Sequence, residues 1–466
     1  MTLRRGRALL LLASLACAPT RVWLVRSADR SARVEVFALR NAQRVAVNGR
    51  AFPPSDAVGF ERLAVSEDGR TVAWPSLRAG RWRLSVNGRE GPPFEGIGDV
   101  AIAPGRPRVA YMALAAGRWS VVVDGVAQAP VEAVLEGSLR WGPGGRRLAY
   151  IARDGGRTFA VIDGARGPDA TAVRALRFGD KGDLVAYIAD ASEGERVVVN
   201  QRPGPVWSEV PALAAADAAP RVVYVGRDRE GWSLLRDEVL VERSPDAIDE
   251  PRISADGAHL AWLRVGHARV EVVRDGVVLG AHADVEGGSL ALSRDGAHLL
   301  WVAVEDQRRR VFRDGVGGPS FDAITEVQAT PEGRWSYVGR AGDVFTAFVD
   351  GRRVRRARAW LGGIALASGS ARWALFARIG PQLAVRSDAG AVVVGYGVGD
   401  SLAFDEAGAR WACLAGSPAT RAVEYVFEGG ARAPFIWEEI GAMLVRGDAL
   451  DGVARRLVRA ELARRR

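Results

Sequence analysis

A polar turn, an apolar strand, a second apolar strand and an Asp-Gly or Asn-Gly pair recur in that order about ten times along the chain. One anchor position in the first of these apolar strands is aromatic in most copies, and its spacing stays between 36 and 39 residues. The anchors are Trp74, Tyr111, Tyr150, Tyr187, Tyr224, Trp262, Trp301, Tyr337, Leu375 and Cys413. A fixed period of this length predicts a repeat architecture.

Large and small side chains alternate around each anchor. The residue two positions before the anchor is always apolar, for example Val72 or Trp335, and shares a face with it. The residue between them is nearly always small, for example Ala261. A face exposed to water would carry polar residues, so we expect this strand to be buried on both faces. The large groups of one sheet would then lie against the small-residue face of its neighbour.

One repeat unit, residues 288–324, predicts four short antiparallel strands. The first two strands are expected at residues 289–293 and 298–304. A third is expected at residues 309–313, followed by the hairpin pair Asp314 and Gly315 and a weaker fourth strand. No helical period of 3.6 residues is present, which argues against helical repeats. Four strands in about 38 residues are typical of a β-propeller blade.

Two strings in the chain resemble the core of WD40-like PD40 repeats, the type found in the TolB propeller. They are residues 66–74 (SEDGRTVAW) and 254–262 (SADGAHLAW). Residues 86–97 resemble a second stretch of bacterial PD40-like propeller proteins. The usual proline of the motif is mostly absent and is kept at Pro331. The resemblance covers about residues 30–445 and implies the propeller fold, while it leaves the function open.

The number of units predicts the domain organisation. Roughly eleven full blades and a partial one exceed the usual four to eight blades of one ring. We therefore expect two six-bladed propellers, residues 20–248 and residues 249–466, with a single large ring as the alternative. The seam is placed at the least regular unit, residues 211–248, where Asp237 and Glu238 replace the Asp-Gly pair.

The first and last units are also irregular. Phe37 is taken as the anchor of the first unit, and residues 441–462 are expected to supply only two strands. A strand near residues 21–26 is expected to pair with this incomplete last blade.

The N-terminus has the features of an export signal, assigned to residues 1–19. Arg4, Arg5 and Arg7 precede a short apolar stretch, residues 8–16, that is too short to span a bilayer. The sequence up to Cys17 resembles the lipobox of bacterial lipoproteins, with Ser14 where leucine is usual.

This resemblance implies lipidation at Cys17. The residue after the cysteine is Ala18 and not aspartate, which implies the periplasmic side of the outer membrane. A simple cleaved secretory signal is the alternative, and an uncleaved anchor or a cytoplasmic protein is a further one.

The chain is basic, with a net charge of +9, and Lys181 is its one lysine among 64 basic residues. A basic surface would suit a polyanion, but these charges are spread among 55 acidic residues. Two clusters stand out, residues 352–358 (RRVRRAR) and residues 307–310 (QRRR). We interpret most of the charge as solvated surface and do not expect a nucleic-acid partner.

No motif of metal, hydrolase or nucleotide chemistry is present. The four histidines, His259, His267, His282 and His298, lack HExxH spacing and a cysteine partner. The aspartates of the Asp-Gly pairs are interpreted as turn residues and not as a cation-binding ring. Cys413 is interpreted as a small buried residue. We expect no metal, no cofactor and no catalytic residues.

These observations favour an exported, lipid-anchored scaffold that binds a protein or another envelope component. One alternative is a propeller enzyme of the lyase or glycosidase type with a site at the channel mouth, for which Asp405 is an ordinary candidate. The other is an Arg-rich module that binds polyanions. The sequence names no ligand-binding residues; we expect them in the inter-blade loops and in the loops between second and third strands, residues 153–154, 227–230, 305–307 and 417–419.

Overall fold

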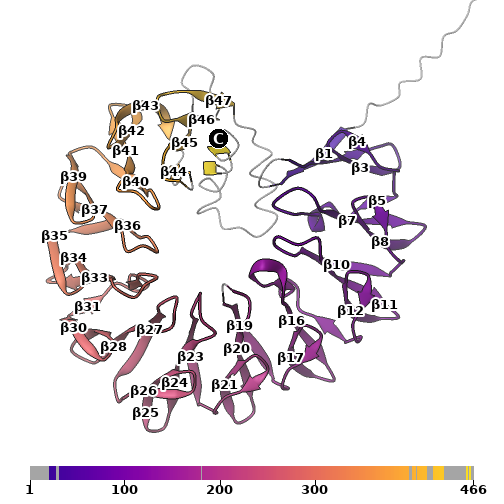
Figure 1. Cartoon of the computed structure of the whole chain (residues 1–466), viewed down its shortest axis with the longest axis horizontal. Helices are drawn as coiled ribbons and strands as arrows, with labels where there is room; N and C mark the ends of the chain where they lie inside the picture. The colour runs from indigo at the N-terminus through magenta and orange to yellow at the C-terminus, as the bar shows by residue number, and fades with distance from the viewer. Residues whose placement is uncertain are drawn as a thin grey trace, which may run out of the picture.

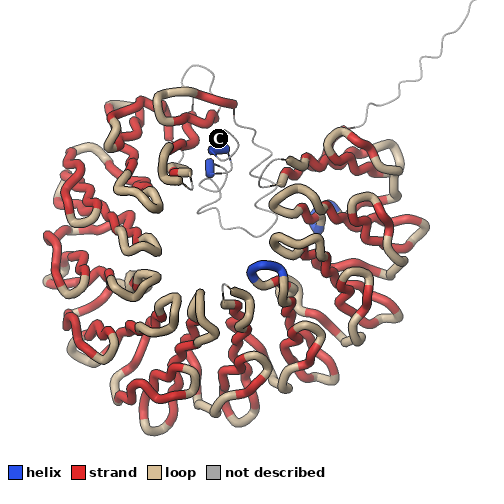
Figure 2. Tube along the Cα trace, in the orientation of Figure 1, coloured by secondary structure: helices blue, strands red, loops and turns tan. Residues whose placement is uncertain are grey.

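Eleven four-stranded blades follow one another around one open ring (Figure 1). The computed structural model describes residues 20–27, 31–179, 181–397, 401–405, 407–416, 423–434, 458, 459, 461 and 462. These residues form nine antiparallel sheets of four or five strands and one sheet of eight strands that holds the last two blades. Strands and tight loops make up nearly all of the ring (Figure 2). The prediction of an all-β propeller is confirmed.

Each blade begins with a strand on the inner side of the ring. In three blades, the second, fourth and eighth, this strand is split into two short pieces. The first strands are β1 (Thr20–Arg26), β5 (Ala57–Val58) with β6 (Ala64–Val65), β10 (Gly96–Ile102), β14 (Ala133–Val134) with β15 (Arg140–Trp141), β19 (Ala172–Phe178), β23 (Glu209–Ala215), β27 (Ala247–Ile253), β31 (Asp284–Val285) with β32 (Ala291–Leu292), β36 (Ala323–Ala329), β40 (Leu361–Leu366) and β44 (Ala403–Phe404).

The second strand of each blade carries the anchor. These strands are β2 (Arg33–Ala38), β7 (Val72–Arg78), β11 (Val109–Ala115), β16 (Leu148–Asp154), β20 (Val185–Ala191), β24 (Val222–Asp228), β28 (Leu260–Val265), β33 (Leu299–Glu305), β37 (Trp335–Ala341), β41 (Trp373–Ile379) and β45 (Trp411–Gly416). Two short 3₁₀ turns, η1 (Phe60–Arg62) and η2 (Pro143–Gly145), lie in the second and fourth blades. Figure 2 shows η2 at the inner rim of the ring.

The third and fourth strands complete each blade toward the outside. The third strands are β3 (Gln43–Val47), β8 (Arg81–Val86), β12 (Arg118–Val123), β17 (Arg157–Ile162), β21 (Gly194–Val199), β25 (Gly231–Arg236), β29 (Val270–Arg274), β34 (Arg308–Arg313), β38 (Val344–Val349), β42 (Gln382–Ser387) and β46 (Val423–Phe427). The fourth strands are β4 (Arg50–Ala51), β9 (Arg89–Glu90), β13 (Val126–Ala127), β18 (Ala165–Arg166), β22 (Arg202–Pro203), β26 (Val239–Ser244), β30 (Val277–His282), β35 (Val316–Phe321), β39 (Arg352–Ala357), β43 (Gly390–Gly397) and β47 (Arg432–Pro434).

Neighbouring blades pack as the alternation of large and small residues predicts. The anchor Trp262 of the seventh blade is fully buried and lies in one apolar cluster with Val223 and Val225 of the sixth blade. The adjacent Ala261 faces the other way, into the cluster that contains Trp301 of the eighth blade. Each second strand is therefore buried on both of its faces, which confirms the prediction.

Two separate rings are not confirmed. The predicted boundary between residues 248 and 249 falls inside a continuous apolar cluster, in which Val225 and Ile248 pack with Trp262. Asp237 and Glu238, the irregular pair, both adopt positive φ angles of 49° and 69°, as the Asp-Gly pairs do. The irregular sequence therefore still forms a regular blade, and the ring continues across it (Figure 1).

The first blade corrects two expectations. Asn48 accepts a hydrogen bond from the N–H of Arg33 at 2.7 Å, as Asn87 does from Val72 at 2.8 Å, so Arg33 corresponds to Val72. The anchor position two residues later is therefore Glu35 and not Phe37. Strand β1, which was expected to pair with the last blade, pairs with β2 of its own blade.

Glu35 gives the ring a polar first face. It is buried and forms ion pairs with Arg21 at 3.2 Å and Arg33 at 2.6 Å. In the other blades this position faces the preceding blade, and the first blade has none. Terminal repeats of an array carry a polar outer face, and Glu35 with its arginine partners gives the first blade such a face among the described residues.

The last blade has an apolar cap. The described residues 458, 459, 461 and 462 are helical, in contrast to the two strands predicted for residues 441–462, of which residues 441–457 lie outside the described part. Val458 and Leu462 are buried in one cluster with Leu414, Tyr425 and Phe427 of the eleventh blade. Among the helices in the part that the structure describes, none is long and apolar enough to cross a membrane.

Burial changes the titration of the tyrosine anchors. The side chains of Tyr111, Tyr150 and Tyr224 are almost completely buried, and burial raises the pKa of each phenol to about 12. Burial also raises the pKa of Tyr187 and Tyr337. The folded ring therefore holds protons that an unfolded chain would release near pH 10.

We expect alkaline pH to destabilise the ring. A phenol with a raised pKa stabilises the fold fully below the ordinary tyrosine pKa, and this contribution is lost as pH rises toward the folded value. Each tyrosine that titrates only when unfolded lowers the free energy of unfolding by about 1.4 kcal/mol per pH unit. Thermal unfolding between about pH 8 and pH 11 measures this loss.

Tyr224→Phe is the matched variant for this experiment. Among the described residues the Tyr224 hydroxyl makes no well-formed hydrogen bond and only a weak contact with the Trp207 indole, so its removal disturbs few contacts. The variant should unfold like the wild type at neutral pH and lose less stability at alkaline pH. An equal alkaline loss in both proteins would contradict the assignment.

Candidate functional site

The aspartates of the Asp-Gly turns join the turn between the third and fourth strands to the second strand of the same blade, so they are not free ligands. In the fourth blade the Asp163 carboxylate accepts hydrogen bonds from the N–H of Leu148 at 2.8 Å and from Nε of Arg147 at 2.7 Å. Nine blades share the bond to the second strand. Its acceptors are Asn48, Asn87, Asp124, Asp163, Asn200, Asp237, Asp275, Asp314 and Asp350.

The residue just before the second strand follows the choice of turn residue. Where the turn has Asp, that residue is basic and contacts the second carboxylate oxygen: Arg108, Arg147, Arg221, His259, His298 and Arg334. Where the turn has Asn, the residue is neutral: Ala32, Thr71 and Leu184. The amide of Asn87 instead donates to the carbonyl of Arg70 at 3.0 Å. The turn aspartates in this set and the asparagines Asn48 and Asn87 therefore have both polar atoms satisfied within the blade, whereas Asn200 Oδ1 also accepts from Arg147 of the preceding blade at 3.0 Å.

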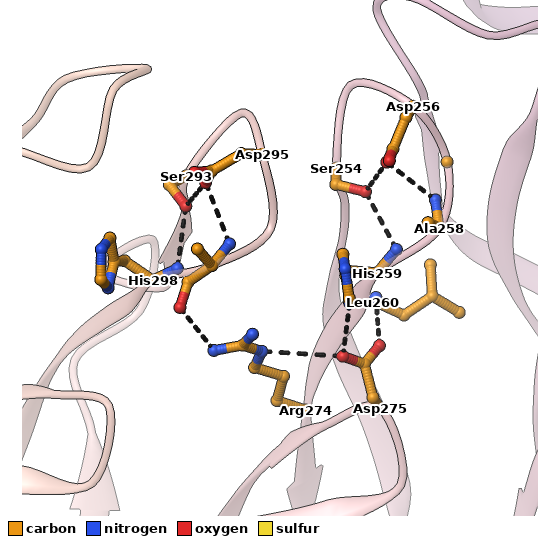
Figure 3. Close-up of polar contacts among 12 residues, drawn as sticks. Ser254, Asp256, Ala258, His259, Leu260, Arg274, Asp275, Ser293, Asp295 and His298 are labelled. Atoms are coloured by element: carbon orange, nitrogen blue, oxygen red, sulfur yellow. Dashed lines mark hydrogen bonds and ion pairs between the residues drawn. The ribbon is translucent and has the colours of Figure 1, made fainter.

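His259 and His298 belong to this closing arrangement, and Figure 3 shows the contact of His259 with Asp275. His259 Nδ1 lies 2.8 Å from Asp275, and His298 Nδ1 lies 2.8 Å from Asp314. Arg274 adds a bond to the next blade by donating to the carbonyl of Ala297 at 2.8 Å (Figure 3). In the described residues no group of histidines, cysteines and carboxylates has the arrangement of a metal site.

Serine and aspartate fix the first turn of the same blades. Ser254 donates to Asp256 at 2.6 Å and accepts from the N–H of His259 at 2.9 Å (Figure 3). The Ser254 hydroxyl is the main reason why the pKa of Asp256 is lowered, and the same contact from Ser293 lowers the pKa of Asp295. These polar groups shape the turn and are used within the blade.

His282 is a buried polar residue that the sequence did not distinguish from the other histidines. The Trp301 indole N–H donates to its Nε2 at 3.1 Å, and its Nδ1 lies 3.0 Å from Glu305. Because Nε2 accepts this hydrogen bond, the ring proton lies on Nδ1, whose N–H donates a hydrogen bond to Glu305. His282 therefore ties the seventh blade to the eighth. His267 lies exposed.

The loops predicted as a binding face use many of their charges among themselves. Asp154 pairs with Arg118 of the preceding blade at 2.6 Å. Arg243 pairs with Asp228 at 2.7 Å and also with Glu230. Residues 417–419 of the fourth predicted loop lie outside the described residues. This face therefore offers few charged groups that lack a partner within the chain.

The inner rim carries acidic residues that the sequence reasoning missed. Glu250 lies at a bulge of β27 with a positive φ of 47°, pairs with Arg252 at 3.0 Å and accepts from the N–H of Gly288 in the next blade. Asp99 accepts from the N–H of Gly137 at 2.6 Å. Such bulges need the ladder register, which a strand pattern alone does not show. Their carboxylates join neighbouring blades.

A cavity of about 460 Å³ lies at this inner rim, lined by parts of the second, third and fourth blades. Arg62 on its wall donates to the carbonyl of Ile97 at 3.0 Å and pairs with Glu136 at 3.2 Å.

Asp405, the one candidate named for catalysis, is buried and accepts from the N–H of Ala409 at 2.8 Å in a turn of the last blade. The structure therefore gives Asp405 a turn-forming contact. Cys413 is fully buried, and burial raises the pKa of its thiol.

The outer rim differs between the two halves of the ring. In the first five blades the fourth strand has two residues, whereas β26, β30, β35 and β39 of the sixth to ninth blades have six each. A proline follows closely after, or at the end of, each of the short strands: Pro53, Pro92, Pro130, Pro168 and Pro203. Of the four long strands only β35 contains a proline, Pro319. Proline lacks an N–H and interrupts the pairing of an edge strand. In the first five blades the outer segment pairs again with the third strand only at one isolated bridge beyond the proline, whereas β35 accommodates Pro319 at its bulge.

The long fourth strands expose apolar side chains and an open backbone edge. Each pairs only with the third strand of its own blade. Val239, Val277 and Val316 occupy equivalent positions in the sixth, seventh and eighth blades and are 68%, 60% and 74% exposed. Each of these strands has one β-bulge, and no other strand covers its outer edge among the described residues. Long apolar edges are unusual in soluble proteins because they pair readily with another chain. We therefore define the outer rim of the sixth to ninth blades, strands β26, β30, β35 and β39, as the candidate site.

Comparisons with known proteins bear on the fold alone. No family model matches the chain, and no curated protein matches it. Solved propellers are similar to it at low identity. TolB from Acinetobacter baumannii is 15% identical, with a TM-score of 0.23 over 51% of this chain and 75% of its own.

Two further propellers show the same degree of likeness. The Cps50 (Swd1) propeller domain from Myceliophteria thermophila is 13% identical, with a TM-score of 0.27 over 53% of this chain and 96% of its own. The propeller domain of the Trilobed protease from Pyrococcus furiosus, which has an open velcro topology, is 12% identical, with a TM-score of 0.25 over 63% and 94%. The class of the protein is an all-β propeller.

We expect Asp163→Ala to lower the free energy of unfolding by about 1–3 kcal/mol, because the buried N–H of Leu148 loses its acceptor. Asp163→Asn keeps that acceptor and should cost less. Asp169→Ala is the control, since Asp169 forms only an exposed ion pair with Arg166. Denaturant unfolding measures all three variants. Equal effects of Asp163→Ala and Asp169→Ala would show that the turn carboxylate does not close the blade.

Proposed function

We propose that the protein is a non-catalytic scaffold that binds a partner protein along the outer rim of its sixth to ninth blades. The observation that carries this proposal is the set of long fourth strands with exposed valines and open backbone edges. A partner strand could pair with such an edge while its side chains cover Val239, Val277 or Val316. In the first five blades proline interrupts this strand, which pairs again only at one isolated bridge, so these blades offer a shorter continuous edge.

The use of charged groups supports a scaffold over an enzyme. Catalysis needs acids, bases or nucleophiles that can reach a substrate. The turn aspartates, His259 and His298 contact one another within the blades, and Asp99 and Glu250 contact the next blade. These groups stabilise the blades and the contacts between them, so the proposal assigns no catalytic residue.

Export and lipid anchoring are part of the proposal. The basic residues before residue 8, the short apolar stretch 8–16 and Cys17 support it, since together they resemble a lipoprotein signal. These residues lie outside the described part. A lipid on Cys17 would hold the propeller at the membrane surface of the cell envelope, on the periplasmic side of the outer membrane, where a binding rim could meet an envelope protein.

A photo-crosslinking residue at Val277 tests the rim in the full-length protein, in the cells that make it. We expect a discrete crosslinked species at this position and at Val239 and Val316. Val126 is the matched control, because it is 71% exposed at the same position of the third blade, where the fourth strand is short. Val278→Pro should abolish the crosslink at Val277, on the same strand, if strand pairing holds the partner.

The distribution of crosslinks decides the proposal. Crosslinks at Val277 but not at Val126, lost on addition of the strand-blocking proline, support it. Crosslinks of equal strength at both positions, or none at any rim position, would overturn it, because surface exposure alone would then explain the result.

Metabolic labelling with radioactive palmitate tests the anchor. Label should enter the wild-type protein and disappear in Cys17→Ala, because the thiol is the proposed attachment point. Cys413→Ala is the control, since Cys413 is fully buried in the eleventh blade. Equal labelling of wild type and Cys17→Ala would contradict lipidation at this residue.

A further inference from the structure

We propose that strand β39 of the ninth blade binds an extended, acidic protein segment, which adds to the blade as a fifth antiparallel strand. This inference rests on the proposed function and names the partner chemistry for one part of the rim. It follows from three features of β39: its open backbone edge, its arginines, and the lack of acidic partners for them.

The backbone edge of β39 is free to pair. β39 is the last strand of its sheet and pairs only with β38. Arg352 lies opposite Val349 across a two-residue turn, and Arg353 lies opposite Phe348. Residues that flank such a turn bond to each other, and the next residue directs its N–H and C=O away from the partner strand. The N–H and C=O of Arg353 therefore point toward the open edge.

The side chains of this strand form a concentrated positive charge. Four of its six residues are arginine and all four are exposed: Arg352, Arg353, Arg355 and Arg356. We call them the β39 arginines. Within the described part of the chain, none of them forms an ion pair with a carboxylate. The acidic residues closest to them in the sequence have other partners. Asp350 pairs with Arg334 at 2.9 Å and Asp343 with Arg358 at 3.7 Å.

The second basic cluster of the sequence shows the opposite behaviour. Arg308, Arg309 and Arg310 of β34 pair with Asp322 at 3.0 Å, Glu286 at 3.4 Å and Glu305 at 3.7 Å. This strand lies inside its sheet, between β33 and β35. The chain thus neutralises an arginine cluster on an inner strand and leaves one on an edge strand unneutralised. Solvated positive charge without partners favours an anionic ligand over a neutral one.

The geometry favours a protein segment over a nucleic acid. In an antiparallel pair, opposite charges on adjacent strands lie directly across from each other and stabilise the pairing. An acidic strand on β39 would satisfy both the open N–H and C=O groups and the arginine charges. A nucleic acid or polysaccharide would meet the charges and leave the backbone edge unpaired. The neighbouring β35 exposes Val316 beside this site, and an apolar residue in the partner could cover it.

Binding of a synthetic acidic peptide to the full-length protein tests this inference. The probe is a fluorescent peptide of about ten residues in which pairs of glutamates alternate with threonines, measured by fluorescence anisotropy. Its glutamates lie on both faces of an extended strand, because Arg352 and Arg355 lie on one face of β39 and Arg353 and Arg356 on the other. The triple substitution Arg353→Gln, Arg355→Gln and Arg356→Gln should weaken binding about tenfold. The control is the triple substitution Arg308→Gln, Arg309→Gln and Arg310→Gln, which removes the same net charge and should leave binding unchanged.

Two further probes separate strand addition from simple charge attraction. An equally acidic peptide with prolines at alternate threonine positions cannot pair with an edge and should bind at least about tenfold more weakly. Heparin should bind more weakly than the strand-forming peptide at physiological salt. Melting temperatures of both triple variants establish that they fold.

The outcomes are distinct. Loss of peptide binding in the β39 triple alone, together with weak binding of the proline peptide, supports the inference. Equal binding of both peptides, tighter binding of heparin, or an equal effect of the two triples would overturn it. If the peptide fails while crosslinks at Val277 persist, the scaffold function stands and only the β39 assignment fails. If the crosslinks fail as well, the proposed function fails with it.

Discussion

The contact of one large anchor side chain with the small-residue face of the preceding blade holds this ring together. Trp262 against Val223 and Val225, and Trp301 against Ala261, are two instances of a contact that repeats around the ring. No strand in the described chain is shared between the first and last blades. Stability therefore comes from each blade and its nearest neighbours, as in a linear repeat array. The two ends need caps for the same reason, and Glu35 at one end and Val458 with Leu462 at the other supply them.

Polar contacts then fix each blade without opening its core. The turn aspartate bonds the second strand and a basic residue, whereas the amides of Asn48 and Asn87 donate to a backbone carbonyl instead. This pairing keeps the charge of each turn balanced. It also means that the residues most suggestive of chemistry are already satisfied. A surface that binds a partner must therefore use groups outside these contacts, and the fourth strands are the elements that meet this condition.

The repeat period and the alternation around each anchor were sufficient to predict the blades, their strand order and their two buried faces. The number of rings was not predictable in the same way. The number of rings depends on the small angle between adjacent sheets, which is set by the volumes of many side chains together. The sequence of one repeat indicates only that two blades are neighbours. Phe37 was taken for an anchor because it is aromatic, although hydrogen bonding places Glu35 there. His282 acquires its role only through Trp301 of the next blade.

The candidate site could have been found from the sequence by comparing the fourth strands instead of the anchors. In the first five blades a proline occurs closely after the fourth strand or, at Pro203, as its last residue, whereas three of the next four fourth strands contain none, although Pro245 directly follows β26. Proline on an edge strand removes a donor and stops pairing with another chain, so its absence leaves an edge available. Because no other strand covers the outer edge of the fourth strand among the described residues, the exposed residues near its start can change with little cost to the core. The same position can therefore hold Val316 in one blade and Arg352 in the next while the blades stay alike, and the outermost strands can vary in what they bind while the anchors keep the ring unchanged.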